Sequence, residues 1–300
     1  MDSRLVDKYF SFVDEISLKY MYDSNIKHLL YLIIPAFVTK YSIYKENLIL
    51  NVFRNIPIII SKERDKQVQA FYTSIPRYQN DKIVTNKYIV LKNYQDISLV
   101  HLLDDLVHEF NHAINSYQKE ILIKDNTLYL RTGLSYASYS ISKFNPIKKD
   151  DSYMLEEILN TNQTEDVINL IKNYQDPNHV DLNNTVYSLN HETDEKYSSQ
   201  AYYLENLLMK SILENKTFIS TLNNLRLTGD VEDIEYWFDN ICGKDNSYHH
   251  LINYLKDMNG LEEKLVSQKI FKNRTINKIK ELIQKILAII QTFNNNCNYK

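Results

Sequence analysis

A chain of 300 residues with 44% hydrophobic and 12% aromatic residues is long and apolar enough to bury a substantial core, as a globular protein does. The 38 acidic and 35 basic residues are mixed along the chain and give a formal net charge of -3, so we expect neither nucleic acid nor an anionic membrane as a partner. The chain has only 4 Gly and 5 Pro. This scarcity disfavours collagen-like proteins, Pro/Gly-rich disordered chains and turn-rich all-β folds, so we expect mainly helix.

The cysteines and the apolar segments bear on the compartment. Cys242 and Cys297 are far apart in the chain and form no CxxC pair, so no disulfide framework is implied. Charged residues between positions 2 and 8 interrupt the pattern of a secretory signal. The apolar segment Leu29–Val38 is too short to cross a bilayer. We therefore expect a cytoplasmic protein without a membrane anchor.

The first third of the chain reads as helices followed by strands. Residues 1 to about 50 have a helical apolar pattern. Three short runs rich in Val, Ile, Phe, Tyr and Thr then follow, each bounded by charged residues or by Asn, Pro and Asp, and they predict a sheet of about three strands: Asn51–Ile60, Gln69–Ile75 and Lys82–Tyr94.

A long helix and a hairpin come next. Apolar residues recur at spacings of three and four over Asp96–Tyr117, which predicts a helix. The segments Ile121–Lys124 and Thr127–Thr132 flank the turn-forming pair Asp125-Asn126 and predict a β-hairpin. The Arg131–Leu134 segment after it either lines a cleft or turns the chain.

Beyond about Ser152 the pattern is helical, with breaks expected near Pro177, Asn190–Thr193, Gly229-Asp230, Gly243 and Gly260. The predicted fold class is therefore α+β and mainly helical, with a small N-terminal sheet. Residues 1–150 would form the α+β part and 151–300 an all-helical C-terminal part.

The chemistry is concentrated in the predicted helix Asp96–Tyr117, which contains the pattern HExxH. His108 and His112 are four residues apart, so both imidazoles project from one face and can reach one metal ion. Glu109 directly follows the first histidine and points aside from the ion, where a carboxylate can accept a proton from an activated water. This spacing predicts a zinc site with Glu109 as general base.

A catalytic zinc usually keeps three protein ligands. Asn115 and Gln118 stand where metzincins carry a Gly and a His, so that class is excluded. The segment Tyr153–Glu165 instead resembles the second motif of gluzincins, Glu-Gly-x-Asn-Glu-x-x-Thr-Glu, with matches at Glu157, Asn160, Thr164 and Glu165. The resemblance covers roughly residues 95 to 210 and implies a zinc metallopeptidase of the gluzincin type, with Glu157 as the third ligand.

The segment departs from the gluzincin pattern at two positions. Ile158 replaces the usual Gly, and Thr161 replaces the acid that orients a zinc histidine. Asn160, a carboxylate or a main-chain carbonyl would then have to accept the second N–H of that histidine. Glu156 is the competing ligand, and either glutamate could instead simply favour the first turn of a helix, Glu156 as an exposed acid there.

The resemblance also implies a Tyr or His that stabilises the oxyanion, for which Tyr197 is the first choice, at the start of an expected helix Tyr197–Leu213, and His191 the second. The implied activity is hydrolysis of a peptide or protein substrate. Such a substrate would lie along a strand edge before the active helix, for which we expect Lys82–Lys92.

Two alternatives remain open from the sequence. One is a non-catalytic, zinc-stabilised peptide-binding protein of the same fold, which the missing acid at Thr161 favours. The other is a helical interaction protein with a chance motif, favoured by the heptad-like C-terminal segments. Metal content and the effect of Glu109→Gln on hydrolysis separate the three.

Overall fold

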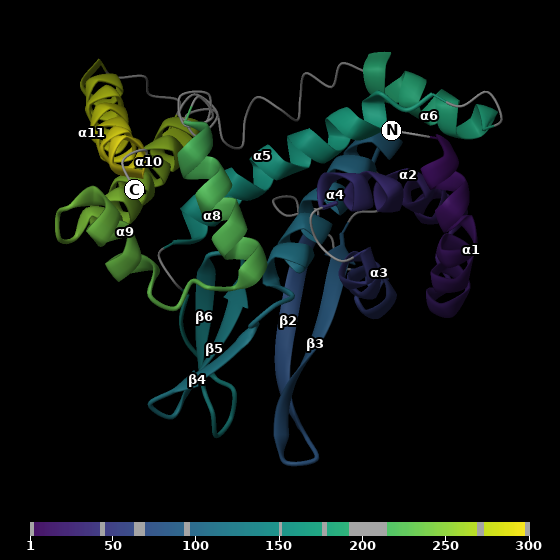
Figure 1. The fold of residues 1–300 in the computed structure, drawn as a ribbon, viewed down its shortest axis with the longest axis horizontal. Helices are drawn as coiled ribbons and strands as arrows, with labels where there is room; N and C mark the ends of the chain where they lie inside the picture. Colours follow the sequence, from purple (N-terminus) through teal and green to yellow (C-terminus); the bar gives the residue numbers. More distant parts are fainter. Residues whose placement is uncertain are drawn as a thin grey trace. The chain divides into compact units, whose positions relative to one another are not determined.

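The protein is described from a computed structural model, drawn in Figure 1. It is mainly helical with two small sheets, and the predicted α+β class is confirmed. The chain divides into two compact units, residues 1–114 with 160–194, and residues 115–159 with 195–300. The described residues are 3–42, 46–62, 70–92, 97–149, 152–175, 179–191, 215–268 and 273–297.

The helical part of the first unit contains α1 (Ser3–Tyr20), α2 (Ser24–Lys40), α3 (Glu46–Asn55) and α6 (Val180–His191). Helix α2 begins after Asp23, whose carboxylate accepts the backbone N–H of Ile26 and so satisfies one of the unpaired donors of the first turn. Its residues from Leu29 to Phe37 are nearly all buried. An uninterrupted apolar run of this kind belongs to a central helix, and α2 is the core of this unit.

The first sheet has the strand order β1-β3-β2 and consists of β1 (Ile58–Ile60), β2 (Ala70–Gln79) and β3 (Lys82–Leu91). The predicted three strands are confirmed, except that Asn51–Asn55 is the end of α3. The expectation of a binding edge at Lys82–Lys92 is wrong over Ile89–Leu91, where β3 pairs with β1 on one side and with β2 on the other. Over Lys82–Tyr88 the described strands pair with β3 on the β2 side alone, so there the expectation stays a prediction. The edge of β2 away from β3 has no partner strand among the described residues.

In the second unit the predicted hairpin is confirmed as β4 (Ile121–Lys124) and β5 (Thr127–Thr132). The sheet continues through β6 (Ser135–Ser140) and β7 (Pro146–Lys149), which the sequence did not predict. Gly133 adopts a φ of 57° in the turn between β5 and β6, a conformation that glycine adopts without steric cost. The segment around it therefore turns the chain, one of its two expected roles.

The described helices of the second unit are the start of α5 (Tyr153–Lys172) together with α8 (Lys216–Thr228), α9 (Ile234–Cys242), α10 (Ser247–Gln268) and α11 (Asn273–Cys297). Aromatic residues Phe218, Phe238 and Phe293 meet at the centre of their core. Left-handed glycines end α8 and α9, as expected for Gly229 and Gly243. The break expected at Gly260 is wrong, because this residue lies within α10; a single glycine lowers helix stability by only about 1 kcal/mol.

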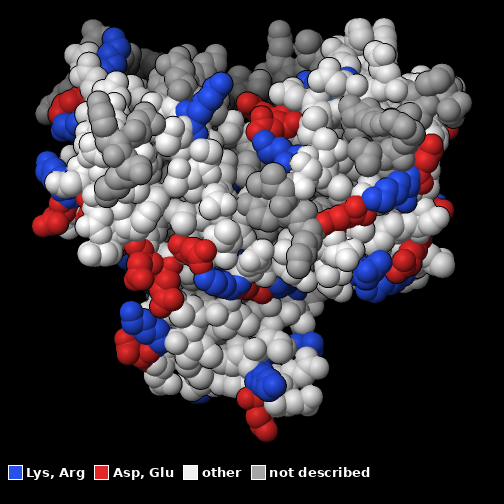
Figure 2. All heavy atoms as spheres, in the orientation of Figure 1, with Lys and Arg blue, Asp and Glu red and all other residues white. Residues whose placement is uncertain are grey.

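Two surface properties agree with the composition. Basic and acidic side chains are interspersed over the face drawn in Figure 2. None of the described helices combines the length and the apolar character that a membrane span needs.

Candidate metal centre

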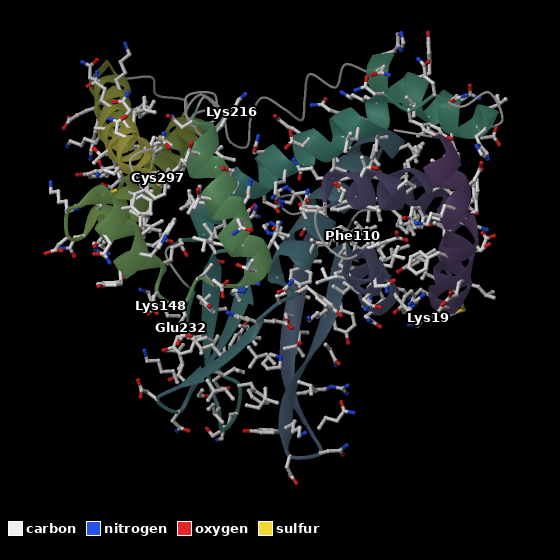
Figure 3. All side chains as sticks on the ribbon, viewed as in Figure 1. Lys19, Phe110, Lys148, Lys216, Glu232 and Cys297 are labelled. Carbon is white, nitrogen blue, oxygen red and sulfur yellow. The ribbon has the colours of Figure 1, made fainter. Side chains whose placement is uncertain are left out.

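The HExxH segment lies in α4 (Leu99–Ser116), a single amphipathic helix. Its apolar side is buried and includes Leu103, Leu106 and Phe110, and the Phe110 ring packs on Phe53 at 4.3 Å between centroids. Figure 3 labels Phe110 among the helices of the first unit. Because successive helical residues are rotated by about 100°, the side opposite Phe110 carries His108 and His112.

The two histidines converge. Their Nε2 atoms lie 3.2 Å apart, and the two rings meet nearly edge to face, at an interplanar angle of 76°. His112 is buried and His108 is partly buried. Two imidazole nitrogens at this separation can share one proton in a hydrogen bond or bind one cation.

Helix α5 docks on α4 through polar contacts that follow the matched motif. The side-chain amide of Asn160 donates to the main-chain carbonyl of His108 at 2.9 Å. One turn further along both helices, the Asn111 amide donates to the Thr164 hydroxyl at 3.1 Å. Both residues of α5 are buried, so these bonds are shielded from water and fix the register of the two helices.

A tyrosine from α2 reinforces this docking. Tyr41 directly follows the last residue of α2. Its hydroxyl lies 2.6 Å from Oδ1 of Asn111 and 3.1 Å from Oε1 of Gln163. The middle residues of HExxH thus have structural partners, Phe110 in the core and Asn111 against α5. Sequence reasoning did not predict the role of Tyr41, because 24 tyrosines in the chain make any one of them uninformative.

Glu157 lies one helical turn before Asn160 in α5, on the same side of that helix. His108, His112 and Glu157 each offer one ligand atom, and these atoms all lie within 4.8 Å of one another. Glu157 is 7% exposed. The group could hold a metal ion, and the expected convergence of the three side chains is present; their role as ligands remains a prediction.

Glu109 is not part of this group. Its Oε2 accepts the backbone N–H of Tyr72 in β2 at 2.5 Å, and its side chain is 7% exposed. On α4 it lies about 100° from His108, on the side opposite Asn111. The carboxylate therefore lies at the outer edge of β2, beside the histidine pair.

Two acidic residues one turn earlier in α4, Asp104 and Asp105, have raised pKa values, so near the histidines their charged forms are disfavoured. Burial raises the pKa of Asp105 to about 7, with smaller increases from the charges of Asp104 and Glu109 and a decrease from His108. Burial also raises the pKa of Asp104. Among the described residues no hydrogen bond satisfies the buried Oδ2 of Asp105. These groups favour a positive charge in their surroundings, which a bound cation would provide.

Glu156, the competing ligand in the sequence, has a different partner. Its carboxylate is fully buried and forms a bidentate pair with Arg226 of α8, with Nε–Oε2 at 2.8 Å and Nη2–Oε1 at 2.5 Å. The expectation that Glu156 is an exposed first-turn acid is therefore wrong. No sequence pattern connects residues 156 and 226, because their contact depends on the packing of α8 against α5.

Of the two residues considered for oxyanion stabilisation, His191 alone lies among the described residues. Tyr197 and the expected helix Tyr197–Leu213 lie outside the described residues. His191 is exposed at the end of α6, where its ring stacks on Tyr187 at 3.9 Å and its Nδ1 lies 2.8 Å from the Tyr187 carbonyl. These contacts do not involve α4, and a role of His191 in oxyanion stabilisation stays a prediction.

The chain has no significant match among protein-family models, curated proteins or solved structures.

Proposed function

We propose that this protein is a zinc-dependent peptidase, with His108, His112 and Glu157 as metal ligands and Glu109 as general base. The observation that carries the proposal is the convergence of two histidines of an HExxH helix with one glutamate of the neighbouring helix. The donor set of two imidazoles and one carboxylate is one of those that catalytic zinc sites use when they keep a position open for water. Two nitrogens bound to one tetrahedral zinc lie about 3.3 Å apart, close to the separation of 3.2 Å in the histidine pair.

When bound, zinc would act as a Lewis acid that acidifies a water molecule and polarises a carbonyl group. Glu109 is suited to move the proton, because it stands beside the ligands and outside their group. The N–H of Tyr72 holds its carboxylate in place, so that the base does not need to reorient between accepting a proton and delivering it to the leaving amine.

The outer edge of β2 is suited to bind the substrate as an added strand. The N–H of Tyr72 points out of the sheet, toward Glu109, and by the two-residue period of a strand so do positions 74, 76 and 78. Pro76 fits this assignment, because a residue without an N–H costs no ladder bond at an outward position. An extended peptide paired there would run beside the histidines, so its carbonyls could approach the metal.

The first experiment measures metal and hydrolysis together. Protein purified without chelator should hold about one zinc per chain, and His112→Ala should lose it. Glu109→Gln should keep the zinc and lose hydrolysis of casein or of quenched fluorescent peptides by several orders of magnitude. Glu235→Gln, at an exposed acid of α9, is the control and should retain both properties.

Absence of zinc from the wild-type protein would overturn the proposal. Zinc without hydrolysis in the wild type would favour the non-catalytic binding protein instead. Activity of Glu109→Gln near that of wild type would assign the base to another residue. For the substrate edge, Ser74→Pro should raise KM and leave zinc content unchanged, since it removes one outward donor of β2.

A further inference from the structure

Glu156 is held from two directions by elements outside α5. Both of its oxygens accept N–H groups of the Arg226 guanidinium, and Oε2 also accepts the backbone N–H of Leu134 at 2.8 Å. Neither Glu156 nor Arg226 is exposed at all. Three donors from α8 and from the turn after β5 therefore fix the position of this carboxylate.

A fixed Glu156 restricts the rotation of α5 about its own axis. A turn of the helix would move the carboxylate away from donors that cannot follow, and an unpaired buried charge is costly. Glu157 is rotated by about 100° from its neighbour. Holding Glu156 toward Arg226 therefore keeps Glu157 directed away from it, on the face that Asn160 and Thr164 present to α4.

The pair also separates the roles of two adjacent glutamates. A bidentate guanidinium neutralises Glu156 and occupies both of its oxygens, so this carboxylate is not available to a cation. Without Arg226, two neighbouring carboxylates could compete for the same ion and draw the first turns of α5 out of position.

We propose that Arg226 is a positioning residue for metal binding: by holding Glu156, it orients Glu157 toward the histidine pair and keeps Glu156 from acting as a ligand. The inference rests on the proposed role of Glu157 as a ligand. Arg226 acts through α5 and does not touch the ion.

The test must separate positioning from stability, because removal of one partner of a buried ion pair can unfold a protein. The double variant Glu156→Leu with Arg226→Met removes both charges and keeps apolar volume, a replacement that buried pairs often tolerate. Zinc affinity of the full chain is measured with a competing chelator, and ligand geometry by the visible spectrum of the cobalt-substituted protein. We expect the double variant to fold cooperatively, to bind zinc about 10- to 100-fold more weakly and to show an altered cobalt spectrum.

Phe238→Leu is the control for stability, because Phe238 is equally buried in the second unit but its ring packs on Phe218 and Phe293. It should lower the denaturation midpoint and leave the zinc affinity and cobalt spectrum of the folded protein unchanged. Arg226→Lys keeps the charge without the planar fork, and its zinc affinity should fall between those of the wild type and the double variant.

Wild-type affinity and an unchanged cobalt spectrum in the double variant would overturn the positioning role and leave the metal site intact. If the double variant does not fold, unchanged zinc binding by Arg226→Lys overturns it equally. If Glu157→Ala binds zinc as tightly as the wild type, then Glu157 is not a ligand, and the proposed site and this inference fail together.

Discussion

The side-chain amide of Asn160 donates to the main-chain carbonyl of His108 at 2.9 Å, so the residue that carries the first imidazole is fixed by the helix that carries Glu157. Asn160 was one of the matched motif positions, and it was also a possible acceptor for the second N–H of a ligand histidine. In the structure it is a donor to the backbone. Asp104 and Asp105, one turn before His108 in α4, instead interact with the His108 imidazole through charge.

Asn160→Ala should therefore weaken both the fold and the metal site. The loss of a buried hydrogen bond should lower the free energy of unfolding by about 1 to 2 kcal/mol, measured by urea denaturation. Zinc affinity should fall, because α5 is no longer held in register with α4. Asn190→Ala removes an exposed amide-to-carbonyl bond of the same kind and should change stability by less than about 0.5 kcal/mol. Equal effects of the two substitutions would contradict this role.

Truncation of the adjacent glutamates Glu156 and Glu157 in α5 should affect different properties: the stability of the metal-free protein for Glu156, and stabilisation by zinc for Glu157. Glu156→Ala leaves the Arg226 charge buried without its carboxylate and should lower the unfolding free energy of the metal-free protein by about 3 to 5 kcal/mol. Glu157→Ala should leave the metal-free protein much closer to wild type in stability. It should instead abolish the rise in melting temperature that zinc produces, because the folded state loses its affinity for the ion. Thermal denaturation with and without zinc tests both expectations.

Stability should fall as pH rises from about 4 to about 7, because Asp105 is a partly buried acid whose pKa is raised from 3.8 to about 7. The folded state then holds this proton more tightly than the unfolded state does. Its contribution is complete below about pH 4 and is lost as pH rises through about 7. Between pH 5 and 8 the loss should be roughly 2 to 3 kcal/mol in metal-free protein.

Asp105→Asn should flatten this dependence, and denaturation curves at pH 5 and 8 would measure it. A residual slope of the same sign is expected from Asp104, whose pKa is also raised by burial. A wild-type protein that becomes more stable between pH 5 and 8 would contradict the assignment.

The sequence predicted those elements whose signal is local. The helix with HExxH, the strands of the first sheet and the hairpin β4–β5 all follow from periodicity and turn residues within about ten positions. Strands β6 and β7 were missed, because segments rich in Ser, Lys and Tyr lack the alternation of a half-buried strand.

The long-range features had no such signal. The order β1-β3-β2 makes β2 the edge strand, which depends on pairing and not on composition. The Glu156–Arg226 pair joins two residues that are 70 positions apart in the sequence, with most of α5 and all of α6 between them. The contact of Tyr72 with Glu109 uses only the backbone N–H, so the identity of the side chain could not reveal it.

Two glycines of the second unit, Gly133 and Gly243, can be compared to test how firmly the Glu156 carboxylate is held. Gly133 and Gly243 have similar positive φ values, 57° and 65°, so an alanine at either position meets a comparable backbone strain of about 1 kcal/mol. Their surroundings differ. A Cβ at Gly133 would lie 1.9 Å from Oε2 of Glu156, whereas a Cβ at Gly243 would have no atom within 4 Å.

Gly133→Ala should consequently cost far more than Gly243→Ala. The new methyl group must displace the Glu156 carboxylate from Arg226 and Leu134, which adds the loss of a buried ion pair to the strain, so we expect about 3 to 5 kcal/mol in total. Gly243→Ala should cost only about 1 kcal/mol, from strain at a helix end. Urea denaturation of the metal-free proteins measures both values. If the two variants lost the same stability, the Glu156 carboxylate would have to move aside at little cost, and its anchoring by Arg226 could not restrain α5.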